Sequence, residues 1–108
     1  MLASCVLAAT ALAACGSSSS VAARQQGCTA VAAVLSDGPD PGADPAGYAE
    51  AQVLPLHQLK LTDTKLRDVV DNLDSAYQAY ASNGGRSLAA RVASEEKVLN
   101  AICPGAAP

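Results

Sequence analysis

The chain has 108 residues, which is enough for one small domain. It contains three Tyr but no Phe or Trp, so Leu, Val and Ala must build the core, and this composition favours closely packed helices over a β-sandwich. The net charge of −3 offers no basic surface of the kind that nucleic acids or anionic lipid headgroups require, so we expect no nucleic-acid partner and no membrane binding except through an attached lipid.

The first 14 residues form an apolar leader. The run from Leu2 to Ala14 is interrupted by only two hydroxyl residues, and it is shorter than the about 20 residues that a membrane-spanning helix needs. Its length and the small residues at its end are typical of a signal peptide. No Lys or Arg precedes Arg24, so the basic start of such a peptide is missing, and we expect that Met1 is not the true start.

The leader ends in Leu12-Ala13-Ala14-Cys15, which is followed by Gly16 and a run of Ser. This sequence resembles the lipobox of bacterial lipoproteins, in which diacylglycerol is joined to the Cys sulfur and a peptidase cuts just before that Cys. The resemblance implies that residues 1–14 are removed and that Cys15 carries the lipid, with fatty acids such as palmitate. Residues 15–21 then form the anchor and a flexible tether.

The same resemblance implies a location at the cell membrane, on its extracytoplasmic face. The composition as a whole is also similar to that of the small, Ala-rich lipoproteins of high-GC Gram-positive bacteria. Many of those have a short helical domain and no assigned activity.

Two Cys remain for the folded domain, because Cys5 lies in the leader and Cys15 would carry the lipid. In an exported protein, Cys28 and Cys103 therefore predict a disulfide. The alternative is a pair of buried free thiols that act as small apolar residues. The sequence has no C-x-x-C spacing, so it indicates neither a redox motif nor a zinc site.

Residues 22–103 are predicted to form an all-α domain. The first helix is expected over residues 22–35, because Cys28, Val31 and Leu35 lie on one helical face. A loop rich in Gly, Pro and Asp follows. Asp44-Pro45 is a start signal for a second helix over residues 46–61, in which Pro55 should cause a kink or an end.

Thr62-Asp63 is a possible cap for a third helix that ends near Ser82 and has the clearest amphipathic pattern in the chain. The apolar face of that helix consists of Leu66, Val69, Val70, Leu73, Ala76, Tyr77 and Tyr80. A last helix is expected over residues 87–102, where Glu95 falls on or near the apolar face. Residues 104–108 are expected to form a loose tail.

The predicted architecture is a small antiparallel bundle of three to four helices, with the N- and C-terminal helices linked by a disulfide. A 15-residue helix separates its ends by about 22 Å, whereas a disulfide needs Cα atoms within about 7 Å. Three equal antiparallel helices would hold Cys28 and Cys103 too far apart. Two arrangements remain: four alternating helices with a turn near Leu61-Thr62, which we favour, or one long bent helix over residues 46–82.

Few residues point to chemistry. His57 is the only His, and its sequence neighbours offer no partner, so we expect a structural residue rather than a metal ligand or a base. The acidic residues of the loop lack the spacing of a calcium site and are expected to be solvated turn residues; they are Asp37, Asp40 and Asp44. The acidic residues of the third helix are expected to form a solvated face, with an acidic binding strip as the alternative; they are Asp68, Asp71 and Asp74.

The Tyr residues offer two interpretations. Tyr48, Tyr77 and Tyr80 could line a groove, but Tyr77 and Tyr80 lie on the apolar face, which favours core packing with a hydrated hydroxyl. The sequence has no catalytic or cofactor-binding motif that we recognise, so we expect neither an enzyme nor a cofactor. We predict a lipid-anchored lipoprotein whose helical domain binds or scaffolds an envelope protein partner. The alternative is a carrier that holds a small apolar or lipidic ligand between its helices.

Overall fold

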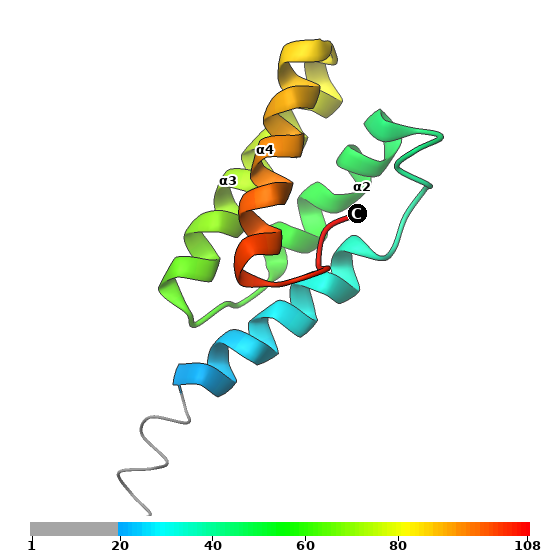
Figure 1. Ribbon diagram of the computed structural model, residues 1–108. Coiled ribbons are helices and arrows are strands. Elements are labelled where there is room, and N and C mark those ends of the chain that lie inside the picture. The colour runs from blue at the N-terminus through cyan, green and yellow to red at the C-terminus, as the bar shows by residue number, and fades with distance from the viewer. Residues whose placement is uncertain (1–19) are drawn as a thin grey trace, which may run out of the picture.

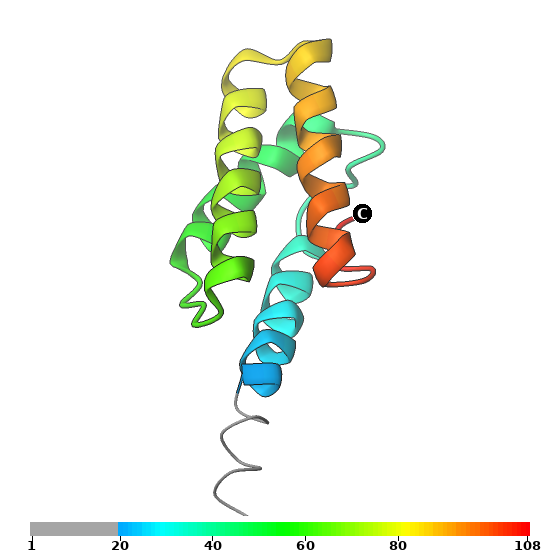
Figure 2. The same cartoon turned by 60° about the vertical axis from the view of Figure 1, so that its left-hand side comes forward.

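A computed structural model describes residues 20–108, and within them the chain forms helices and no strand. The helices are four in number: a first helix over residues 20–35, α2 (Pro45–Gln58), α3 (Thr64–Asn83) and α4 (Arg86–Ile102). They alternate in direction, so that α3 and α4 form an antiparallel pair (Figures 1 and 2). The all-α prediction and the four-helix arrangement are confirmed. Cys15 and the leader lie outside the described residues.

The first helix crosses α3 at a glycine. A Cβ atom on Gly27 would lie 2.6 Å from Leu66 Cδ2, so the absence of a side chain allows this close approach. Val31 and Leu35, on the predicted apolar face, are buried. Residues 20 and 21, which were assigned to the tether, belong to this helix.

Helix α2 begins at the predicted signal. The side chain of Asp44 accepts a hydrogen bond from the Gly47 amide at 3.0 Å, and Pro45 occupies the first turn. The helix ends at Gln58, three residues earlier than predicted. Pro55 lies inside this last turn, where its missing N–H removes one helical hydrogen bond, and Leu59 is already extended.

Helices α2 and α3 are separate, so the long bent helix over residues 46–82 is excluded. The carboxylate of Asp63 caps α3 by accepting a hydrogen bond from the Leu66 amide at 2.9 Å. A second tight connection joins α3 to α4, where Gly84 and Gly85 have φ values of 63° and 92°. Both conformations favour glycine, which explains why the chain reverses at this point.

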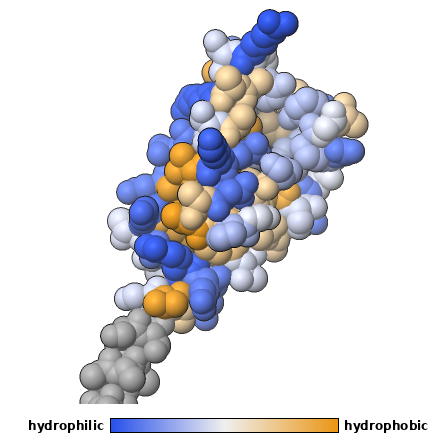
Figure 3. Space-filling model, in the orientation of Figure 1, coloured by the Kyte–Doolittle hydropathy of each residue, from blue (hydrophilic) through white to orange (hydrophobic). Residues whose placement is uncertain are grey.

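The core lies around α3, which packs against both α2 and α4. The predicted apolar face of α3 is buried except for Tyr80, which is only partly buried. The side chains most completely buried in the described chain include Leu66, Leu73, Tyr77 and Leu99. On the visible surface, apolar side chains form small groups separated by hydrophilic ones (Figure 3).

The predicted disulfide between Cys28 and Cys103 is present, with a Cα–Cα distance of 5.3 Å. It joins the middle of the first helix to the residue that follows α4. A second link between distant segments is the ion pair of Arg24 with Asp63, whose Nε and Oδ2 atoms are 3.2 Å apart. Both links fix the first helix against the rest of the bundle.

The segment after Cys103 differs from the loose tail that was predicted. Ala106 and Ala107 are buried with the core. The side chain of Asn100 accepts a hydrogen bond from the Ala107 amide at 2.8 Å and donates one to the Ala107 carbonyl at 3.3 Å. The small Ala side chains allow this segment to fold back against the bundle, and the two hydrogen bonds satisfy its backbone.

None of the helices in residues 20–108 combines the length and the apolar character that crossing a membrane requires.

Candidate functional site

Two surface pockets contain residues that the sequence analysis selected. The first, which we call the disulfide groove, has a volume of about 560 Å³ and is lined by residues that include Val21, Arg24, Cys28, Ile102 and Ala106. The second, which we call the tyrosine pocket, has a volume of about 320 Å³ and is lined by residues that include Pro45, Tyr48, Tyr77, Tyr80, Val92 and Glu96. Both volumes lie within the range of small-molecule sites, about 300–1,000 Å³.

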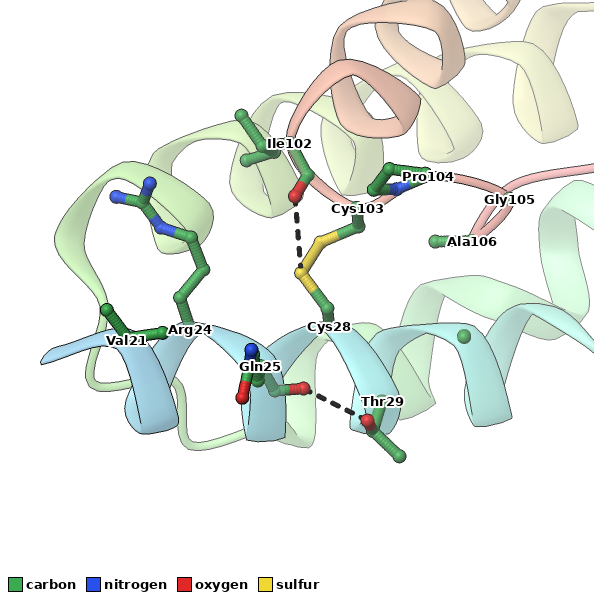
Figure 4. Close-up of a pocket in the computed structure, with 11 residues that line it drawn as sticks. Val21, Arg24, Gln25, Cys28, Thr29, Ile102, Cys103, Pro104, Gly105 and Ala106 are labelled. Atoms are coloured by element: carbon green, nitrogen blue, oxygen red, sulfur yellow. Dashed lines mark hydrogen bonds between the residues drawn. A yellow bond between two sulfur atoms is a disulfide. The ribbon is translucent and has the colours of Figure 1, made fainter. Parts of the chain in front are cut away.

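The disulfide groove lies between the first helix and the segment that follows α4 (Figure 4). Its floor includes the disulfide, and Cys28 Sγ lies 3.6 Å from the Ile102 carbonyl oxygen. Because a disulfide sulfur carries no proton, this is a van der Waals contact rather than a hydrogen bond. The charge of Arg24 is already balanced by Asp63, so this groove offers an apolar surface without a free charge.

Asp63 makes two structural contacts, the cap of α3 and the ion pair with Arg24. The Leu66 amide, and then the Arg24 guanidinium, hold the pKa of the Asp63 carboxyl below its ordinary value. The residue therefore stays ionised as a cap and as an ion-pair partner. This geometry assigns Arg24 and Asp63 to the fold and not to a binding site.

The tyrosine pocket has a different chemistry. The rings of Tyr48 and Tyr77 meet edge to face, with centroids 5.9 Å apart and planes at 84°. The Tyr48 hydroxyl donates to the Leu35 carbonyl, and the Tyr77 hydroxyl donates to Glu96 Oε2 at 2.7 Å. The prediction of core packing is confirmed for Tyr77, and its hydroxyl contacts a carboxylate. The alternative, a groove lined by all three Tyr, is also realised in this pocket.

Burial controls the ionisation of this pocket. It raises the pKa of Tyr48 to about 12 and raises the pKa of Tyr77 further, so both hydroxyls remain protonated donors. Burial also raises the pKa of Glu96, and the hydrogen bond from Tyr77 only partly opposes this effect. Glu96 is therefore a carboxylate whose charged form is poorly solvated.

Sequence reasoning missed Glu96 and selected its neighbour Glu95. The spacing from Val92 to Leu99 places residues 95 and 96 equally close to the apolar face, because they lie three and four residues after Val92. In the structure Glu96 lines the tyrosine pocket, and Glu95 is not among its lining residues. The sequence showed that a carboxylate interrupts the apolar face of this helix. It did not show which of the two Glu residues occupies that face.

His57 has a partner that the sequence did not show. Its Nδ1 atom lies 3.5 Å from Oδ2 of Asp74 on α3, and the His57 side chain is 79% exposed. Burial raises the pKa of Asp74, and the neighbouring His57 opposes that shift. Asp74 therefore does not belong to the solvated acidic face that was predicted for it, whereas Asp68 and Asp71 are exposed.

Two carboxylates of the loop accept hydrogen bonds from nearby backbone amides. Asp40 Oδ1 accepts a hydrogen bond from the Gly42 amide at 2.8 Å, and Asp44 caps α2. The Asp37 carbonyl accepts from the buried Gln52 side chain at 2.8 Å, which ties the loop to α2. Within residues 20–108, no cluster of three or more His, Cys, Asp or Glu side chains is arranged to hold a metal ion.

No known protein family, curated protein or solved structure matches the chain.

Proposed function

We propose that this protein is a lipid-anchored lipoprotein of the extracytoplasmic membrane face, attached through Cys15, whose helical domain acts by binding rather than by catalysis. The observation that carries the proposal is the Cys28–Cys103 disulfide. Disulfides persist in oxidising compartments outside the cytoplasm, which is where a lipobox directs a protein. The pairing uses both Cys of the domain, so Cys15 is the cysteine left for the lipid.

The tyrosine pocket supports a binding role. It combines apolar walls with a few polar groups that converge on one place, which is the usual make-up of a small-molecule site. A catalytic role receives less support. His57 faces solvent, and its recorded partner is Asp74, with no nucleophile hydrogen-bonded to the imidazole among the described residues.

A carrier that holds an apolar ligand between the helices also receives less support. Large side chains fill the space between the helices, since Leu66, Leu73 and Leu99 are each 0% exposed. An apolar ligand would therefore have to use a surface pocket. The domain surface remains available for an envelope protein partner, which crosslinking in the native envelope followed by mass spectrometry would identify.

Mass spectrometry of the protein extracted from membranes tests the anchor. We expect an N-terminal peptide that begins at Cys15 and carries a diacylglyceryl group. Cys15→Ala should abolish this adduct and release the protein or leave it unprocessed, whereas the matched Cys5→Ala variant should be lipidated normally because residue 5 is removed. A membrane-extracted protein with an unmodified Cys15 would overturn the proposal.

A further inference from the structure

Glu96 is the charged group of the tyrosine pocket, and no ion pair within residues 20–108 includes it. The two ion pairs of the described chain are Arg24 with Asp63 and His57 with Asp74. The hydrogen-bond donor on Glu96 is the neutral hydroxyl of Tyr77. The pocket therefore holds a half-buried carboxylate whose charge the described side chains leave unbalanced.

The aromatic walls have a matching electrostatic character. The faces of Tyr rings carry partial negative charge and attract cations within about 6 Å of the ring centre. Tyr48 and Tyr77 stand at nearly a right angle to each other, and Tyr80, which is partly exposed, adds a third ring to the lining. Tyr48 and Tyr77 are only 3% and 1% exposed, so Tyr80 is the ring that presents its surface to a ligand, and this ring and the Glu96 carboxylate suit a positive charge with an apolar shell.

The rest of the lining selects the kind of cation. Pro45, Ala89 and Val92 offer methyl and methylene groups. A metal ion would need several oxygen ligands, which this pocket does not supply. An alkylated ammonium ion instead presents methyl groups to apolar walls and needs only one counter-charge.

We propose that the tyrosine pocket binds a small, soluble organic cation with an alkylated ammonium group, whose methyl groups contact the Tyr80 ring and the apolar walls and whose charge faces Glu96. This inference rests on the proposed binding role of the domain and specifies its ligand. The bound cation compensates for the hydration that Glu96 lost on folding. It therefore stabilises the ionised form of this carboxylate relative to the protonated form.

The test uses choline as the probe and 3,3-dimethylbutan-1-ol, its uncharged carbon analogue of the same shape, as the control ligand. Binding is followed by NMR titration of the Tyr48, Tyr77 and Tyr80 ring signals. We expect choline to shift these signals with a Kd on the order of tenfold lower than that of the alcohol, because only choline gains the ion pair and the cation–π contacts. Tyr80→Ala should weaken choline binding without unfolding the domain, since Tyr80 is only partly buried.

Glu96→Gln is the decisive variant, because it keeps an acceptor for the Tyr77 hydroxyl but removes the charge. We expect it to lose most of the preference for choline over the alcohol. Glu95→Gln is the matched control, since it removes the neighbouring charge on α4 from a residue outside the pocket lining, and it should bind like the native chain.

Equal binding of the two probes, unchanged in Glu96→Gln, would overturn the cation assignment while leaving a binding pocket for apolar ligands. The absence of any ring shift with choline would also overturn it. Neither result bears on the lipid at Cys15, which is measured separately, so failure of this inference and failure of the proposed anchor can be distinguished.

Discussion

Removing the disulfide, whose Cys103 is buried in the core, should strongly lower the stability of the domain. The bridge joins residues that are 75 positions apart. For a loop of that length, the chain-entropy model gives a loss of about 4.5 kcal/mol at 25 °C when the cross-link is removed. A domain of this size has a free energy of unfolding of roughly 5–10 kcal/mol, so Cys28→Ala/Cys103→Ala should lose about half of it or more. The melting temperature should fall by on the order of 20 °C.

Urea unfolding followed by far-UV circular dichroism measures this loss. The native chain in reductant should resemble the double variant, and reductant should leave the double variant unchanged. The first helix should remain packed against α3 in the double variant. The Arg24–Asp63 ion pair and the close packing at Gly27 do not depend on the bridge. A loss below about 1 kcal/mol would refute the argument that the bridge acts by restricting the unfolded chain.

Three further predictions follow from individual contacts. Leu73 is 0% exposed, so Leu73→Ala should lower the free energy of unfolding by about 2–5 kcal/mol in urea titrations, and a smaller loss would mean that the site collapses around the cavity. Asp44→Ala removes the cap of α2 and should cost about 1 kcal/mol in the same assay, whereas Asp44→Asn, which keeps an acceptor, should cost less. Burial raises the folded-state pKa of Glu96, so its contribution to stability is complete below the unfolded-state pKa of about 4.3 and is lost as the pH rises through the folded-state pKa. Glu96→Gln should therefore be more stable than the native chain at pH 7 in thermal melts, with a difference that disappears near pH 4, and an equal difference at both pH values would contradict this.

The fold could be predicted from the sequence where local signals were strong. Asp44-Pro45 and Asp63 begin α2 and α3 because a carboxylate at these positions satisfies a free amide of the first turn. The period of α3 identified its buried face because apolar residues at helical spacing must meet the core. The end of α2 was misplaced by three residues, because the sequence does not show whether a helix stops at a proline or continues past it for part of a turn.

The candidate site was less predictable, because it is made by contacts between elements. Tyr77 and Glu96 are separated by 19 positions and meet only when α3 and α4 pair as a hairpin. His57 and Asp74 likewise meet only through the packing of α2 on α3. A single sequence identifies the polar residues on each helix, but it does not fix the rotation of one helix against the next, and that rotation decided between Glu95 and Glu96.

The position of the tyrosine pocket connects the two proposals. The start of the first helix, in blue, lies at one end of the described chain, and the turn between α3 and α4 lies at the other (Figure 1). Tyr80 and Ala89, which line the pocket, are close in sequence to that turn, whereas Val21 and Arg24, which line the disulfide groove, are at the start of the first helix. For a lipid on Cys15, as proposed, we expect the membrane on the side of the disulfide groove and the tyrosine pocket on the side of the aqueous phase. This orientation favours a soluble cation over a headgroup in the same bilayer. Free choline should therefore shift the Tyr signals of the anchored protein in phosphatidylglycerol vesicles, whereas including phosphatidylcholine in those vesicles should not, and the reverse result would contradict the orientation.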